Sequence, residues 1–225
     1  MSEGFLLRIK YVKHGRLAYL SHLETIRTME RVIRRAQLPY AVSEGFNPHM
    51  KVSFGPALPV GAASDCEYLD LRLREYVAPA EALARMQAMS VPELTPVECF
   101  YIGLRDDAAT VAFPVSAWEA RFADCEAHRL QTAFDALVEQ GYIEVMRKPK
   151  KKRGPMEAKQ VPFENRLVEE PVCEQDGADV RVRFTTCAQA DGSLRPDKLI
   201  EAALEKLDGE RPRLRGFVRR DLRGL

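Results

Sequence analysis

Two histidines are the most chemically versatile side chains in this sequence. His22 and His49 can act as base and acid in metal-independent RNA cleavage, or they can bind phosphate. A structural role, in which each imidazole hydrogen-bonds to loop carbonyls, is the open alternative. No HxH or HxxxH spacing supports a metal site. We expect His22 to lie in the first turn of a helix, where the helix dipole disfavours a protonated imidazole and keeps it neutral near pH 7.

A segment rich in proline and glycine surrounds His49. Residues 39–61 read PYAVSEGFNPHMKVSFGPALPVG, which is longer than a simple connection between two elements. Proline and glycine fix the shape of the backbone, and polar side chains stand between them. The candidates for an anion-binding site here are Asn47, His49, Lys51 and Ser53. The segment therefore predicts a preformed site, although a long hairpin with an ornate turn is the alternative.

Basic side chains form two further groups. Three arginines follow one another at i, i+4 and i+7 on one face of the predicted first helix, where they can contact phosphates. These are Arg27, Arg31 and Arg34. Only Glu30 has the spacing for an i,i+4 ion pair with one of them. A basic loop supplies Lys150, Lys151 and Lys152. A solvated surface is the alternative explanation for both groups.

Composition and motifs exclude several classes of protein. The formal net charge is +1, and local basic patches on such a chain permit nucleic-acid binding without requiring it. The sequence has no GxGxxG after a strand, no phosphate-binding GxxxxGK[ST] and no GxSxG, which disfavours nucleotide-driven and serine-hydrolase enzymes. Five widely spaced cysteines without CxxC predict free thiols, and they do not suit an iron–sulfur cluster or a zinc site.

The location of the protein also follows from apolar patterning. No apolar run approaches the roughly 20 residues of a membrane span, and the N-terminal residues lack a secretory pattern. We therefore expect a cytoplasmic protein without a membrane partner.

The order of elements that must position these residues is β-α-β-β-α-β. Residues 5–12 alternate as a strand does, and SHLE at 21–24 is a capping box that starts the first helix. The pattern recurs after residue 107. The sequence therefore predicts an α+β fold of two tandem ferredoxin-like units with antiparallel sheets, over residues 1–107 and 108–225.

Motifs over residues 5–75 resemble the radical-SAM-linked protein family, a bacterial domain found beside or fused to radical SAM enzymes. The matching motifs are K-x-G at 13–15, SHL at 21–23, RR-x-x-LP at 34–39, GFNPH-x-K-x-SF at 45–54, LPVG at 58–61 and E-Y-x-D at 67–70. The chain carries Met50 where that family often has proline. It lacks a CxxxCxxC cluster motif, so the resemblance implies a companion domain. The partner enzyme would carry the iron–sulfur cluster and S-adenosylmethionine.

Three functions follow from these observations. The first is a non-catalytic companion of a radical SAM enzyme that binds RNA or another anionic substrate, with no cofactor or metal of its own. The second is a metal-independent ribonuclease that uses His22 and His49. The third is a protein–protein adaptor that docks the radical SAM enzyme through the GFNPHMK loop.

Overall fold

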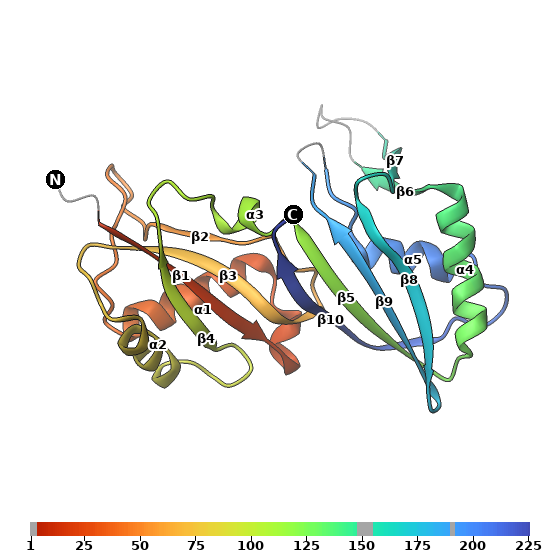
Figure 1. Cartoon of the computed structure of the whole chain (residues 1–225), viewed down its shortest axis with the longest axis horizontal. Coiled ribbons are helices and arrows are strands. Elements are labelled where there is room, and N and C mark those ends of the chain that lie inside the picture. The colour runs from red at the N-terminus through yellow and green to blue at the C-terminus, as the bar shows by residue number, and fades with distance from the viewer. Residues whose placement is uncertain (1–3, 148–154, 190–191) are drawn as a thin grey trace. The chain divides into compact units, whose positions relative to one another are not determined.

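The computed structural model describes residues 4–147, 155–189 and 192–225. The chain divides into two compact units (Figure 1), one made of Met1–Pro114 and Arg219–Leu225 and the other of Val115–Val218. Both units combine helices with antiparallel strand pairs, so the predicted α+β class is confirmed. The division at residues 107 and 108 stays a prediction of domain ranges.

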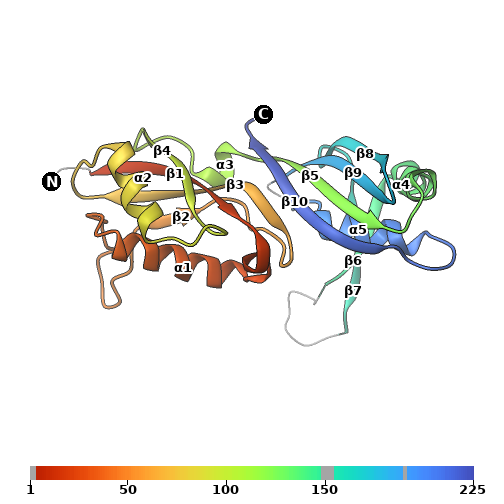
Figure 2. The same cartoon turned by 90° about the horizontal axis from the view of Figure 1, so that it is seen from below.

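The first unit builds one sheet from segments on both sides of its first helix. Its elements are β1 (Phe5–Lys13), the 3-10 turn η1 (Gly15–Tyr19), α1 (His22–Arg35), β2 (Val52–Phe54), β3 (Ala63–Leu73), α2 (Pro79–Ala88), β4 (Pro96–Ile102) and α3 (Ala109–Ala112). The sheet order is β4-β1-β3, with β2 also paired to β3 and the end of β10 (Arg213–Arg223) next to β3. β1 is antiparallel to both of its neighbours. Figure 2 shows α1 running along this sheet.

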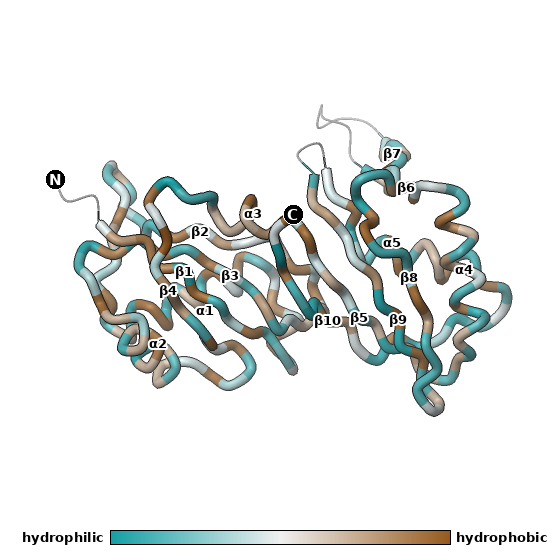
Figure 3. Tube along the Cα trace, viewed as in Figure 1, coloured by the Kyte–Doolittle hydropathy of each residue, from teal (hydrophilic) through white to brown (hydrophobic). Residues whose placement is uncertain are grey.

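Alternating side chains place the core of this unit on one face of the sheet. Leu7 and Ile9 of β1 are fully buried, and they share a core with residues of both α1 and α2. The alternation of polar and apolar residues along β1 and β3 is visible in Figure 3. Both helices therefore pack on this face, as the period of two predicts.

The predicted capping box starts α1. Ser21 is the N-cap, the Ser21 amide donates to Glu24 Oε2 at 2.8 Å, and the Glu24 amide donates back to Ser21 Oγ. The buried residues of α1 are Thr25, Met29, Val32 and Ile33, whereas Leu23 in the first turn is 63% exposed.

The second unit forms a further antiparallel sheet and a separate hairpin. Its elements are β5 (Val115–Ala123), α4 (Ala127–Gln140), β6 (Tyr142–Arg147), β7 (Glu157–Pro162), β8 (Leu167–Asp176), β9 (Asp179–Cys187), α5 (Pro196–Glu205) and the first part of β10. The order is β10-β5-β9-β8, while β6 and β7 form a separate two-stranded sheet. A turn at residues 164–166 separates β7 from β8.

Among the helices of residues 4–147, 155–189 and 192–225, none has both the length and the hydropathy to cross a bilayer. All five cysteines are free thiols, as predicted.

Candidate functional site

The exposed face of α1 keeps most of its arginines without a carboxylate partner. Arg34 pairs with Glu30 at 2.9 Å, which confirms the predicted i,i+4 pair. Arg27, Arg31 and Arg35 are also exposed. Within the part of the chain that the structure describes, no carboxylate oxygen lies within 4.0 Å of these three guanidinium groups. They remain available to an external anion.

Arg31 and Arg35 line one surface pocket, which we call the arginine pocket. It has a volume of about 310 Å³, and its other lining residues are Thr28, Val32, Met89, Val91 and Leu94. Arg31 and Arg35 are four residues apart and therefore share a helix face. Met89 and Val91, which are 44% and 50% exposed, give the lining an apolar part. Two guanidinium groups beside an apolar wall suit a planar or phosphorylated anion.

His49 is held by the loop in which it lies. Its Nδ1 is 3.0 Å from Ser43 Oγ and 3.1 Å from the Asn47 carbonyl oxygen, and its backbone amide donates to Ser43 Oγ at 3.1 Å. The Ser43 amide donates to the His49 carbonyl at 2.8 Å. His49, Asn47, Lys51 and Ser53 all have exposed side chains. The loop is therefore ordered by its own hydrogen bonds and presents polar groups to solvent.

The two candidate histidines lie at different ends of α1. His22 is the first residue of this helix, whereas the segment 43–50 lies beyond its C-terminal end in both views (Figures 1 and 2). A helix of 14 residues is about 20 Å long at ~1.5 Å per residue. This placement favours separate roles for His22 and His49.

His22 contributes to a second, much smaller pocket, which we call the polar pocket. Its lining residues are Tyr11, Lys13, His22, Thr25, Leu58 and Glu67. The volume is about 10 Å³, which is room for about one water-sized group. Tyr11 and Glu67 face each other across the β1–β3 ladder. Lys13, only 2% exposed, donates from Nζ to the Leu20 carbonyl at 2.7 Å.

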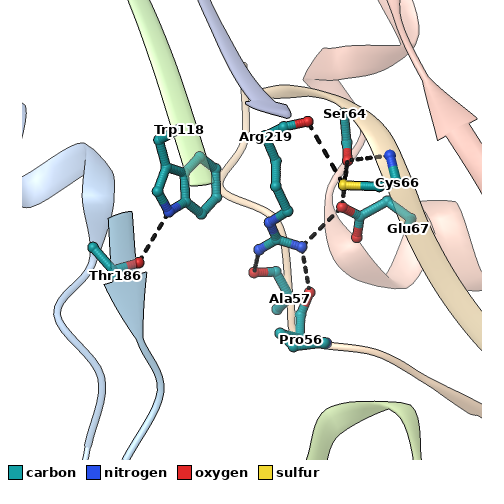
Figure 4. Close-up of polar contacts among 8 residues, drawn as sticks. All are labelled: Pro56, Ala57, Ser64, Cys66, Glu67, Trp118, Thr186 and Arg219. Atoms are coloured by element: carbon teal, nitrogen blue, oxygen red, sulfur yellow. Dashed lines mark hydrogen bonds and ion pairs between the residues drawn. The ribbon is translucent and has the colours of Figure 1, made fainter. Parts of the chain in front are cut away.

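Glu67, which lines the polar pocket, forms a buried ion pair with Arg219 (Figure 4). Glu67 Oε1 accepts from Arg219 Nη1 at 2.8 Å and from Ser64 Oγ at 2.6 Å. The same guanidinium donates to the carbonyls of Pro56 and Ala57 at 3.1 and 3.2 Å. The last strand of this unit thereby fixes both the carboxylate and the backbone that precedes the LPVG turn.

Burial sets the protonation of the groups around this pocket. It lowers the pKa of Lys13, against the opposing effect of Glu67, and it raises the pKa of Tyr11 well above its usual value. Burial also lowers the pKa of His22, with Lys13 acting in the same direction. The lowered pKa agrees with the expected neutral imidazole, and its largest cause is burial.

The remaining predicted residues stay separate from these pockets or cannot be placed. Lys150, Lys151 and Lys152 lie outside the described residues. Searching the residues that the structure does describe finds no group of three His, Cys, Asp or Glu side chains suited to a metal ion.

Sequence reasoning missed the polar pocket as a site, although the signal was present. Tyr11 and Lys13 continue the period-two face of Leu7 and Ile9, so a lysine falls on a core-facing position. On β3, Glu67 likewise occupies a core-facing position, because it lies on the same face as the buried Leu69 and Leu71. Charged residues at core positions are rarely buried unless they are paired or functional.

The comparisons with known proteins identify a family. The family model described as "Uncharacterized protein conserved in bacteria (DUF2344)" matches residues 6–196, and the chain belongs to this family. No curated protein matches the sequence. One similar solved structure is titled "Crystal Structure of a Cbf5-Nop10-Gar1 Complex", with 12% identity and a TM-score of 0.46. That match covers 97% of this chain, which spans about half, 49%, of the other chain.

Proposed function

We propose that this protein is a non-catalytic companion of a radical SAM enzyme and that it binds RNA or another anionic substrate through α1. The observation that carries the binding proposal is the arginine pocket. Arg31 and Arg35 line it together, and neither has a carboxylate within 4.0 Å among the residues described in the structure. Arginine forms strong, often bidentate hydrogen bonds with phosphate and carboxylate groups, so two arginines on one pocket can bind an external anion.

The shape of the pocket supports a nucleotide segment as the anion. A phosphate can take the two guanidinium groups, while an unstacked base can rest on the apolar wall of Met89 and Val91. Arg27 and the polar loop around His49 extend the polar surface of the same unit.

The motifs at residues 13–70 support a radical SAM enzyme as the partner of this protein. Their resemblance to the radical-SAM-linked family favours an enzyme that supplies the iron–sulfur cluster and S-adenosylmethionine, and a cytoplasmic location. We also propose that both units are ferredoxin-like. The orders β4-β1-β3-β2 and β10-β5-β9-β8 support this proposal, although the second unit also contains the β6–β7 hairpin between its first helix and β8.

RNA binding across a salt series tests the binding proposal. Single-stranded RNA should bind with a steep negative slope of log affinity against log salt. The double variant Arg31→Glu/Arg35→Glu should weaken binding and reduce this slope by about 1.4, because each phosphate that is no longer neutralised lowers the slope by ~0.7.

A charge-matched control separates a local site from general attraction. Arg211→Glu/Arg213→Glu changes two exposed arginines of the second unit by the same charge. If both double variants lose affinity equally, the arginine pocket is not the site. If the wild-type protein does not bind RNA even at low salt, RNA is excluded as the substrate.

A protein–protein adaptor is the second candidate because of the tip of the loop. Phe46 is 106% exposed on a loop that His49 and Ser43 hold in shape. A rigidly presented aromatic is typical of an interface anchor. Loss of complex formation with the radical SAM partner in Phe46→Ala, with normal complex formation in Arg31→Glu/Arg35→Glu, would favour this candidate.

A further inference from the structure

Arg31 in the arginine pocket is held in place by its own helix. Its Nη2 donates to Thr28 Oγ1 at 3.1 Å, and the Thr28 hydroxyl donates in turn to the Glu24 carbonyl at 2.8 Å. Thr28 also lines the arginine pocket. A guanidinium that is oriented before its ligand arrives loses less side-chain freedom on binding, so its hydrogen bonds contribute more to affinity.

The two arginines of the pocket carry more positive charge than one internal phosphate of a nucleic acid balances. Within the described residues, neither Arg31 nor Arg35 has a carboxylate within 4.0 Å. A phosphodiester carries one negative charge, whereas a terminal phosphomonoester carries about 1.5 to 2 near pH 7 because its second pKa is ~6. The charge of the lining therefore matches a terminal phosphate better than an internal one.

The surface next to the arginine pocket is acidic, which limits how a nucleic acid can continue. A second pocket, which we call the acidic pocket, extends the lining along both helices. Gln37 follows α1 in this pocket, and Glu75, Glu81 and Arg85 come from α2 and the residues before it. Arg85 pairs with Glu81, whereas Glu75 has no ion pair in the part of the chain that the structure describes. A phosphate backbone that continued past Arg35 in this direction would meet these carboxylates.

The opposite direction along α1 carries a further arginine. Arg27 is exposed one helical turn before Arg31, and Glu24 on that side already accepts from Ser21 in the capping box. Carboxylates repel phosphates, while arginines attract them. The distribution of charge therefore directs an RNA away from the acidic pocket and toward Arg27, so that one end of the RNA lies in the arginine pocket.

The volume of the arginine pocket suits one nucleotide. About 310 Å³ lies at the lower end of the ~300–1,000 Å³ that is typical of small-ligand pockets, so the pocket has no room for a longer stretch of chain. Met89 and Val91 form the apolar part of the lining, on which one base can lie.

We propose that the arginine pocket binds the terminal phosphorylated nucleotide of a single-stranded RNA. Arg31 and Arg35 bind the terminal phosphate, Thr28 is the residue that positions Arg31, and the RNA leaves the pocket toward Arg27. This inference rests on the proposed RNA binding and adds that the protein recognises an RNA end. A 5′-phosphate and a 3′-phosphate share this chemistry, so the experiment separates them.

Four RNAs of one sequence and length test the end site with the whole chain. They are a linear RNA with a 5′-phosphate, one with a 3′-phosphate, one with hydroxyl groups at both ends, and a circular RNA. At least one phosphorylated RNA should bind about 10-fold more tightly than the hydroxyl RNA, because its terminal phosphate adds charged hydrogen bonds. The circular RNA has as many phosphates as each phosphorylated linear RNA but no end, so it should bind no better than the hydroxyl RNA.

The ratio of the affinities for phosphorylated and hydroxyl RNA locates the site. Arg31→Glu/Arg35→Glu should abolish this preference, and Thr28→Val should lower it, whereas Thr28→Ser keeps the hydroxyl and should retain it. Thr132→Val is the matched control, because Thr132 Oγ1 likewise donates to a carbonyl of its own helix, that of His128, at 2.9 Å. A partly unfolded variant loses affinity for both RNAs equally, so the ratio separates positioning from a loss of stability.

The end site and RNA binding give different negative results. Equal affinity for the phosphorylated, hydroxyl and circular RNAs would overturn the end site and leave RNA binding intact. A phosphate preference that survives in both Arg31→Glu/Arg35→Glu and Thr28→Val would also overturn it, because the end would then bind elsewhere. Absence of binding by all four RNAs would exclude RNA binding together with the end site.

Discussion

Replacing Arg219 by methionine should lower the free energy of unfolding of the first unit more than any other single substitution that removes a charged side chain near the polar pocket. The guanidinium is 2% exposed, and it donates to Glu67 and to the carbonyls of Pro56 and Ala57. Methionine fills similar space but leaves the Glu67 carboxylate buried without its counter-ion. Removing one partner of a buried ion pair costs about 3–5 kcal/mol, and we expect Arg219→Met to fall in that range.

The next residue in the same strand provides the control. Arg220 pairs with Asp65 at 2.9 Å on the surface, and exposed pairs contribute only about 0–1 kcal/mol. Urea unfolding followed by far-ultraviolet circular dichroism measures both variants. Hydrogen exchange of residues 55–62 adds a local measurement, because the backbone at Pro56 and Ala57 is released from β10 in Arg219→Met only.

A double variant tests whether Arg219→Met is costly because it leaves the Glu67 carboxylate buried without a counter-ion. In Arg219→Met/Glu67→Met no charge is left buried, so the double variant should be more stable than Arg219→Met alone. The account is refuted if Arg219→Met costs no more than Arg220→Met, or if the effects of the two substitutions simply add.

Two further predictions follow from the protonation of buried groups. Because burial lowers the pKa of His22, the folded chain binds this proton less tightly than the unfolded chain. The free energy of unfolding should therefore fall as pH drops below about 6.5, and His22→Gln should flatten that part of a pH series; an unchanged slope would contradict it. Burial also raises the pKa of Cys66 and Cys173 to about 12 and of Cys99 to about 11, so iodoacetamide at pH 8 should label these thiols slowly in the native protein and rapidly in urea. Fast native labelling of Cys66 or Cys99, measured by mass spectrometry, would show that these two thiols are not buried as described.

Local patterns predicted the elements of the first unit well. The alternation in β1 and β3, the Ser21 capping box and the Glu30–Arg34 pair depend on residues close in sequence, and all are present. Apolar character alone did not predict burial, because Leu23 is 63% exposed while the neighbouring polar Thr25 is buried.

The polar pocket depends on contacts that local patterns do not contain. Glu67 and Arg219 are separated by 152 residues, and they meet because β10 returns to the edge of β3. The buried pair of Arg8 and Asp70 likewise requires the β1–β3 register, which places these two residues opposite each other. A sequence shows that charged residues occupy core positions, but pairing them requires the sheet order.

The polar pocket and the arginine pocket use neighbouring turns of one helix. His22 and Thr25 line the first pocket, whereas Thr28, Arg31, Val32 and Arg35 line the second. Only the outermost residues are well separated, because His22 begins α1 and Arg35 ends it, which places them about 20 Å apart at ~1.5 Å per residue. Substitutions at that distance without shared partners act additively, so His22→Gln should leave RNA affinity unchanged and should not alter the effect of Arg31→Glu/Arg35→Glu. A loss of RNA affinity in His22→Gln, measured in the same salt series, would show that the two pockets are coupled through α1.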